Sequence, residues 1–132
     1  MDYYMTTTVK TSFDQTIDLV TEALSSEGFG VLTDIDVKAT MKKKLDLEYR
    51  NYRILGACNP PFAHKAFEHD DKIGVLLPCN VIVQEWEPGR VEVSAVDPLV
   101  SMQAVGGSGL ESVATEVRER LERVLKAITP AT

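Results

Sequence analysis

Two short segments of this chain pair a cysteine with an asparagine, and between them they contain both cysteines of the sequence. Cys58 precedes Asn59, Cys79 precedes Asn80, and His64 follows the first pair. A thiol becomes a nucleophile when a helix N-terminus or an imidazole lowers its pKa. Because prolines flank both segments, we predict two loops that converge on one small site. Cys58, Cys79 and His64 are its candidate catalytic residues, and Asn59 and Asn80 are candidate ligand-binding residues.

The same residues also have structural explanations. Free cysteines are among the most buried residue types, so Cys58 could fill the corner where a strand meets a helix. Cys79 is in phase with Val81 and Val83, and a period of two would place all three on the core face of a strand. A helical histidine such as His64 commonly faces solvent. The sequence leaves the reactive and the structural roles open.

A metal site is not predicted from these residues. Zinc accepts cysteine and histidine ligands, but Cys58, His64 and Cys79 lack a Cys-x-x-Cys pair and a fourth ligand. The glycine-rich run 106–109 precedes a predicted helix, yet it lacks the lysine of a phosphate-binding loop. A hinge is the simpler interpretation of that run, and no cofactor is predicted.

A second group of candidate ligand-binding residues combines tyrosine with arginine. Tyr52 and Arg53 begin a predicted strand, and Tyr49 and Arg50 precede them. Arginine binds carboxylates and phosphates through two parallel hydrogen bonds. Arg50 and Arg53, with Tyr49 and Tyr52, could therefore line a pocket for a carboxylate or phosphate ligand, and Tyr52 and Arg53 are candidate ligand-binding residues. Exposed residues of an ordinary strand would give the same pattern.

Composition and charge exclude several classes of protein. The chain has 132 residues, a net charge of -6, and 44% apolar and 26% charged residues, which is typical of a globular domain. An acidic chain lacks the clustered lysines and arginines of a nucleic-acid-binding protein, so no nucleic-acid partner is expected. The basic run 42–44 is expected at a helix C-terminus, where cations are favourable.

No apolar run reaches the roughly 18 residues that a membrane-spanning helix needs. The first residues, 1–5, lack the basic start of a secretory signal. We therefore expect a cytoplasmic protein with no membrane partner, in which both cysteines are reduced.

Hydrophobic periodicity predicts the elements that position these residues. Strand patterns cover 3–9, 29–35, 52–57, 73–77, 81–86 and 91–96, and helix patterns cover 13–27, 36–45, 60–69 and 108–128. Capping boxes at Ser12 and Ser108 begin the first and last helices. The segment 98–109 is predicted as a loop. This order predicts a single α+β domain over residues 1–132, with helices packed on a largely antiparallel sheet.

Four runs of the sequence resemble the DUF302 family of bacterial and archaeal proteins. They are 37–44, 52–60, 74–81 and 93–98, and the two Cys-Asn steps fall within the second and third runs. The resemblance implies a compact α+β domain with a curved antiparallel sheet carrying helices, in a TBP-like arrangement, and it implies a homodimer. It implies no activity, because the family is named for its unknown function.

Two functional hypotheses follow from the sequence, and whether the protein is an enzyme stays open. In the first, the two Cys-Asn loops form a small pocket for thiol-dependent redox chemistry or for handling a sulfur-containing ligand. In the second, the cysteines are structural, and the protein is a non-enzymatic module that binds a small molecule or a protein partner.

Overall fold

The computed structural model describes residues 2–106 and 108–130. Within them, five strands form one antiparallel sheet in the spatial order β1-β5-β4-β3-β2. The strands are β1 (Tyr4–Val9), β2 (Gly30–Asp36), β3 (Tyr52–Cys58), β4 (Cys79–Glu87) and β5 (Arg90–Val96). The predicted α+β class, with helices packed on an antiparallel sheet, is confirmed.

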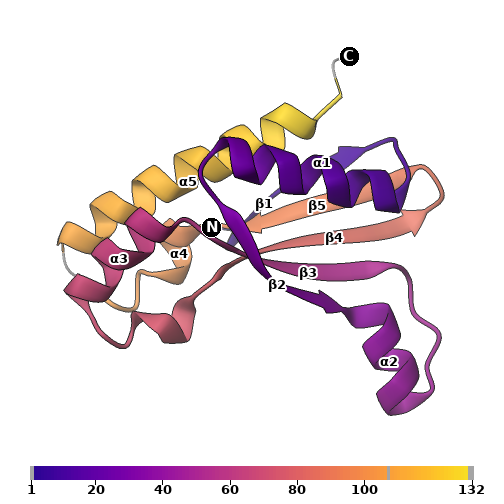
Figure 1. The fold of residues 1–132 in the computed structure, drawn as a ribbon, viewed down its shortest axis with the longest axis horizontal. Helices are drawn as coiled ribbons and strands as arrows, with labels where there is room; N and C mark the ends of the chain where they lie inside the picture. The colour runs from indigo at the N-terminus through magenta and orange to yellow at the C-terminus, as the bar shows by residue number, and fades with distance from the viewer. Residues whose placement is uncertain (1, 107, 131–132) are drawn as a thin grey trace.

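Helices α1 (Phe13–Ser26) and α5 (Ser108–Ile128) lie side by side over one face of the sheet (Figure 1). The N-terminus of α1 forms as predicted, because the Ser12 hydroxyl accepts a hydrogen bond from the Gln15 backbone N–H at 3.1 Å. Gly28, with φ of +88°, ends this helix and returns the chain to the sheet. The two helices enclose the main hydrophobic core against the strands.

Residue alternation along the strands decides which side chains enter this core. In β4, Val81 and Val83 are fully buried under α1 and α5, whereas Ile82 between them points to the opposite face. That opposite face is not covered by a helix in the described part of the chain (Figure 1).

Helix α2 (Val37–Leu45) projects from the end of β2, away from the rest of the fold (Figure 1). None of its residues is buried. The three lysines 42–44 lie in its last turn, as expected from the favourable interaction of cations with a helix C-terminus.

The segments that lead into and out of the sheet differ in part from the predictions. The strand predicted over 73–77 is instead a short 3-10 helix, η1 (Ile73–Leu76), followed by Leu77 and Pro78 before β4 starts. The loop predicted over 98–109 contains a short helix, α4 (Pro98–Ser101). Gly107 and the side chain of Ser108, and with it the predicted cap, lie outside the described part of the chain. The remaining helix, α3 (Pro60–His69), begins after Asn59 as predicted.

Candidate functional site

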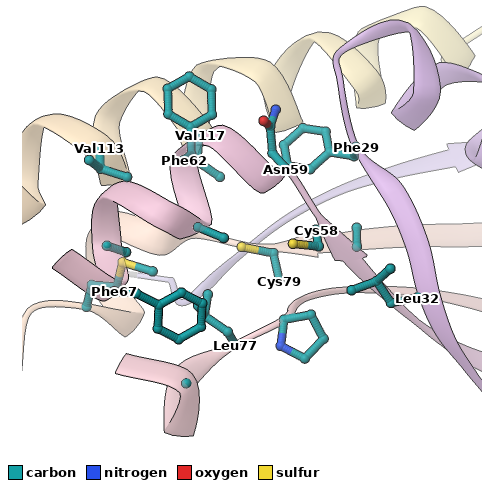
Figure 2. Close-up of a pocket in the computed structure, with 16 residues that line it drawn as sticks. Phe29, Leu32, Cys58, Asn59, Phe62, Phe67, Leu77, Cys79, Val113 and Val117 are labelled. Atoms are coloured by element: carbon teal, nitrogen blue, oxygen red, sulfur yellow. The ribbon is translucent and has the colours of Figure 1, made fainter. Parts of the chain in front are cut away.

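A pocket of about 290 Å³ lies between α3, α5 and the adjoining ends of β3 and β4 (Figure 2). The side chains that α3 and α5 contribute to it are all apolar: Phe62, Ala63, Ala66, Phe67, Val113 and Val117. Pro60 starts α3 directly after β3, which turns this face of the short helix toward the sheet end. The result is an apolar hollow at the point where the two Cys-Asn segments meet.

Both cysteines line this pocket. Ala57 is the partner of Cys79 across the β3–β4 ladder, so Cys58 lies one residue beyond the position opposite Cys79. Figure 2 shows the two cysteine side chains next to each other, and both are free thiols. Cys79 is buried, whereas Cys58 is half-buried and is the more accessible of the two.

The environment of Cys79 keeps its thiol uncharged. Burial, and to a lesser degree the neighbouring Cys58, raises the pKa of the Cys79 thiol from 9.0 to about 11. At neutral pH the thiol is therefore protonated. Because the thiolate is the reactive species, Cys79 is a weak nucleophile in this pocket and presents a small polarisable apolar surface.

The structure does not bring His64 to the two cysteines. The side of α3 that faces the pocket carries Phe62, Ala63 and Ala66. His64 comes next after Ala63, and the turn of the helix directs its side chain away from the pocket. The His64 side chain is 77% exposed, and its Nδ1 lies 3.4 Å from a carboxylate oxygen of Glu68, one turn along the helix. The expected general base is thus absent from the described pocket lining.

Asn59 is the one amide side chain in the pocket lining, and it also fixes the start of α3. It is 7% exposed, and its Nδ2 donates to the backbone carbonyl of Glu27 at 3.2 Å. The side chain makes no capping hydrogen bond to α3, although Asn59 occupies the N-cap position. Its amide instead ties the β3–α3 corner to the end of α1.

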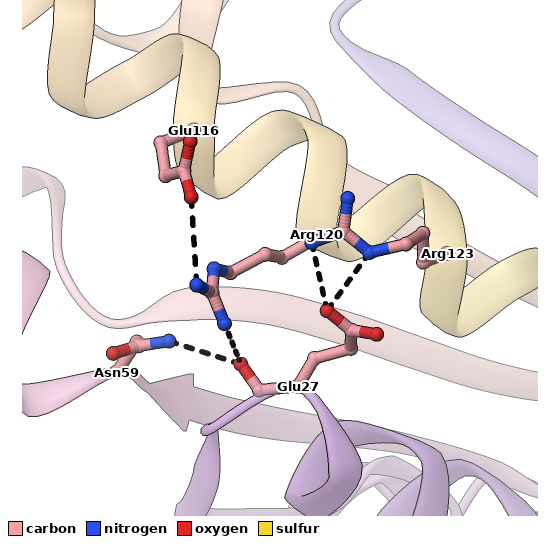
Figure 3. A network of polar contacts seen from close by, with 5 residues as sticks. All are labelled: Glu27, Asn59, Glu116, Arg120 and Arg123. Carbon is pink, nitrogen blue, oxygen red and sulfur yellow. Dashed lines mark hydrogen bonds and ion pairs between the residues drawn. The ribbon is translucent and has the colours of Figure 1, made fainter.

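The same carbonyl of Glu27 accepts a second hydrogen bond from α5 (Figure 3). Arg120 Nη1 donates to it at 3.1 Å, and Arg120 Nη2 lies 3.4 Å from Glu116. The Glu27 carboxylate pairs with Arg123 at 2.9 Å. Glu27 therefore joins the C-terminal end of α1 to α5 through both its backbone and its side chain.

Arg120 also contacts Phe62, one of the residues that line the pocket. Its guanidinium carbon lies 5.2 Å from the centroid of the Phe62 ring, a cation–π contact. Its Nε is buried and makes no hydrogen bond. Phe62 is thus held between the pocket and a cation that is itself fixed by Glu27 and Glu116.

A glycine in β3 allows the floor of the pocket to form. A Cβ on Gly56 would lie 2.7 Å from Cγ of Pro78 and would also collide with the Thr33 hydroxyl. The missing side chain lets Pro78 pack directly against the strand beside Cys79. An isolated glycine inside a strand pattern is the sequence feature that could have indicated this close approach.

Asn80 and Tyr52 lie on the other face of the sheet. Asn80 follows Cys79 in β4, and strand alternation turns it to the uncovered face. Both residues line a second cavity, of about 530 Å³, on that face. The single site predicted from the sequence is therefore divided: Cys58, Cys79 and Asn59 line one pocket, and Tyr52 and Asn80 line another.

Arg53 belongs to neither hollow. Its Nε donates to Asp34 at 3.0 Å, and a second contact to the same carboxylate makes the pair bidentate. This pairing raises the pKa of the Arg53 guanidinium. The charge predicted to bind a ligand is engaged by the neighbouring strand β2.

Two classes of feature are absent from the part of the chain that the structure describes. Across residues 2–106 and 108–130, there is no group of three or more histidine, cysteine, aspartate or glutamate side chains placed to hold a metal ion. None of the described helices is long and apolar enough to cross a membrane.

The sequence and the fold both identify the family. Residues 5–128 match the family described as "Domain of unknown function DUF302", and the chain belongs to this family. A crystal structure of an uncharacterised conserved DUF302 protein from Bacillus stearothermophilus is similar, with a TM-score of 0.89 and 27% sequence identity. The similarity covers 97% of this chain and 99% of that chain. No curated protein matches the chain.

Several residues that line or support the pocket are not indicated by the sequence. Arg120 and Glu27 showed only as charges on amphipathic helices, because nothing local indicates their contact across 93 residues of chain. Met102 lines the pocket from the segment predicted as a loop. Phe67 belongs to the apolar side of the helix predicted over 60–69, but an apolar side alone does not show that a residue borders a pocket.

Proposed function

We propose that this DUF302 protein binds a small, largely apolar molecule in the pocket between α3 and α5. The observation that carries the proposal is the lining of the pocket, in which Asn59 and two thiols are the polar side chains among aliphatic and aromatic ones. A concave apolar site with a few convergent polar groups is the usual form of a small-molecule site. Its volume, about 290 Å³, is at the small end of the range for ligand pockets.

The two thiols suit such a ligand. A protonated thiol is a weak hydrogen-bond donor and a polarisable surface, so Cys79 contacts an apolar ligand without a large desolvation cost. Cys58, which is more accessible, lies beside it. The ligand would pack on these sulfurs and on the rings of Phe62 and Phe67.

A fluorescent probe tests this proposal. N-phenyl-1-naphthylamine is neutral and brightens in apolar surroundings, and we expect saturable binding to the native protein. Ala63 lines the pocket, so Ala63→Trp should fill it and weaken binding at least tenfold. His64→Trp is the matched control, because it places the same side chain on the solvent side of α3.

The outcomes separate clearly. Loss of binding in Ala63→Trp with binding retained in His64→Trp supports the pocket. Equal binding by both variants would place the probe elsewhere, and no saturable binding to the native protein would contradict the proposal. Thermal unfolding of each variant shows whether it is folded.

Thiol-dependent chemistry is the second candidate, and the observation that favours it is the presence of both free cysteines in one pocket. With oxidised glutathione as the oxidant, the Cys58 thiolate would displace one glutathione thiolate and form a mixed disulfide. Cys79 would lose its proton and attack the Cys58 sulfur, releasing the second glutathione. The chain would lose two hydrogens and gain one disulfide, and the oxidant would yield two glutathione thiols.

Intact mass spectrometry tests this second candidate. Incubation with oxidised glutathione should lower the mass by two hydrogen atoms, and Cys79→Ser should stop at the glutathione adduct of Cys58. A native chain that keeps both thiols, or that accumulates only the adduct, would contradict the disulfide step.

A further inference from the structure

Arg50 differs from the other arginines of the described chain in its partners. Each of the other five forms an ion pair with a carboxylate: Arg53, Arg90, Arg118, Arg120 and Arg123. No ion pair joins Arg50 to any described carboxylate. A half-buried arginine without a carboxylate has charge available for a ligand.

The guanidinium of Arg50 is nevertheless held firmly. It lies against three aromatic rings, with its central carbon 4.1 Å from the ring centroid of Trp86, 4.6 Å from that of Tyr49 and 5.6 Å from that of Tyr52. Stacking on aromatic rings is favourable for arginine and restricts its rotation. Little side-chain entropy then remains to be lost when an anion binds.

One hydrogen bond sets the orientation of this guanidinium. Arg50 Nε donates to Gln84 Oε1 at 2.9 Å, and Gln84 Nε2 donates to Glu92 Oε1 at 3.1 Å. Glu92 thus determines which end of the Gln84 amide faces Arg50. Since Nε is engaged, the two terminal nitrogens of Arg50 form the edge that can bind an anion.

This arginine lies at the rim of the cavity on the uncovered face of the sheet. Gln84 and Tyr52, which Arg50 contacts, both line that cavity of about 530 Å³. Tyr4, the first residue of β1, and Tyr3 just before it also line this cavity, and Ile82 forms part of its floor. The cavity therefore combines aromatic walls with a cation at its rim.

The charges around the cavity select the class of ligand. Arg50 supplies one positive charge next to the lining residues Gln84 and Tyr52, whereas Glu92 places a carboxylate in the lining itself. Glu92 repels a group with two negative charges more strongly than a group with one, and a monoanion matches the single positive charge of Arg50. We propose that the uncovered face of the sheet is a second ligand site, in which Arg50 binds the carboxylate of an aromatic carboxylic acid.

Trp86 provides a direct test, because it is the only tryptophan of the sequence and stacks on Arg50. We expect benzoate to change its fluorescence in a saturable manner, and rising sodium chloride to weaken that binding. Benzyl alcohol, which has the ring without the charge, should give no saturable change. These measurements need no variant and so do not depend on the folding of one.

Substitutions then assign the effect to Arg50. Arg50→Gln should weaken benzoate binding at least tenfold, and Arg50→Lys, which keeps the charge but loses the planar fork, should retain part of it. Arg123→Gln is the charge-matched control, since Arg123 pairs with Glu27 on the helical side of the sheet. Its benzoate affinity should equal that of the native protein.

Several results would overturn the proposal. They are the absence of a saturable response to benzoate, equal responses to benzoate and benzyl alcohol, and native affinity in a folded Arg50→Gln protein. Tighter binding of phenyl phosphate than of benzoate would contradict the choice of a monoanion. The pocket beside α3 plays no part in these outcomes.

Discussion

Asn59 donates its side-chain amide to the backbone carbonyl of Glu27, and this contact joins the corner between β3 and α3 to the end of α1. Arg120 on α5 donates to the same carbonyl (Figure 3). Three helices that border or support the pocket therefore meet at one oxygen atom. The position of α3, and with it the shape of the pocket, depends on this junction.

Replacing Asn59 by alanine should destabilise the protein. The variant loses one hydrogen bond of a buried amide, which costs about 1–2 kcal/mol of the free energy of unfolding. The Glu27 carbonyl keeps its bond to Arg120, so the loss should not be larger. Asn80→Ala is the matched control, since Asn80 is exposed on the uncovered face, and its effect should stay within about 0.5 kcal/mol. Equal effects of the two substitutions in urea unfolding would contradict this account of Asn59.

Gly56 should not tolerate a methyl group. In Gly56→Ala the new Cβ would crowd Pro78, at 2.7 Å from its Cγ, and we expect a loss of about 1–3 kcal/mol in the free energy of unfolding. Gly30→Ala in the neighbouring strand has open space around its Cβ and should change stability by less than about 0.5 kcal/mol. Thermal unfolding of both variants checks the difference, and a stable Gly56→Ala protein would show that the strand and Pro78 are not in close contact.

Burial of Cys79 should make stability fall at alkaline pH. Its pKa is raised from 9.0 to about 11 in the folded protein, so between these values the folded chain holds a proton that the unfolded chain has lost. The stabilisation is complete below pH 9 and is lost as the pH rises toward 11, by up to roughly 2 kcal/mol. The Cys79→Ala variant has no thiol at this position and therefore lacks this pH-dependent stabilisation. The difference in unfolding free energy between native protein and variant should therefore shrink from pH 8 to pH 10.5, and a constant difference would contradict the raised pKa.

Cys79 should also resist alkylation at neutral pH. In Cys58→Ser, burial still raises the pKa of Cys79, although the smaller contribution of Cys58 is lost, so the variant holds much less thiolate at neutral pH than an exposed cysteine does, and burial slows access further. Iodoacetamide labelling followed by mass spectrometry measures this rate. Labelling of Cys79 in folded Cys58→Ser as fast as in the denatured chain would show that the pocket does not protect it.

Many of the helices, strands and turns were predictable, because each depends on residues that are close together in the sequence. The Ser12 cap and the apolar stripe of the following residues give α1, and the glycine at 89, with φ of +82°, gives the hairpin turn between β4 and β5. The strand predicted from residue 73 is wrong, since a short apolar run does not by itself distinguish a strand from the 3-10 helix that forms over 73–76.

The site was predictable only in part. The two cysteines lie in one pocket. Each Cys-Asn step was predicted to act as a unit, whereas alternation in β4 places Cys79 and Asn80 on opposite faces. The phase of α3 likewise turns His64 to solvent. The contact between Asn59 and Glu27 joins residues far apart in the sequence and leaves no local pattern.

Nuclear magnetic resonance of the native protein tests the central claim most directly. Titration of 15N-labelled protein with indole, a small neutral aromatic molecule, reports which amides sense the ligand. The account predicts saturable shifts concentrated at the pocket, in Cys58, Phe62, Ala63 and Ala66, with little change at Asn80 on the other face. Shifts that are absent from α3, or that gather on the uncovered face of the sheet, would contradict a ligand pocket between α3 and α5.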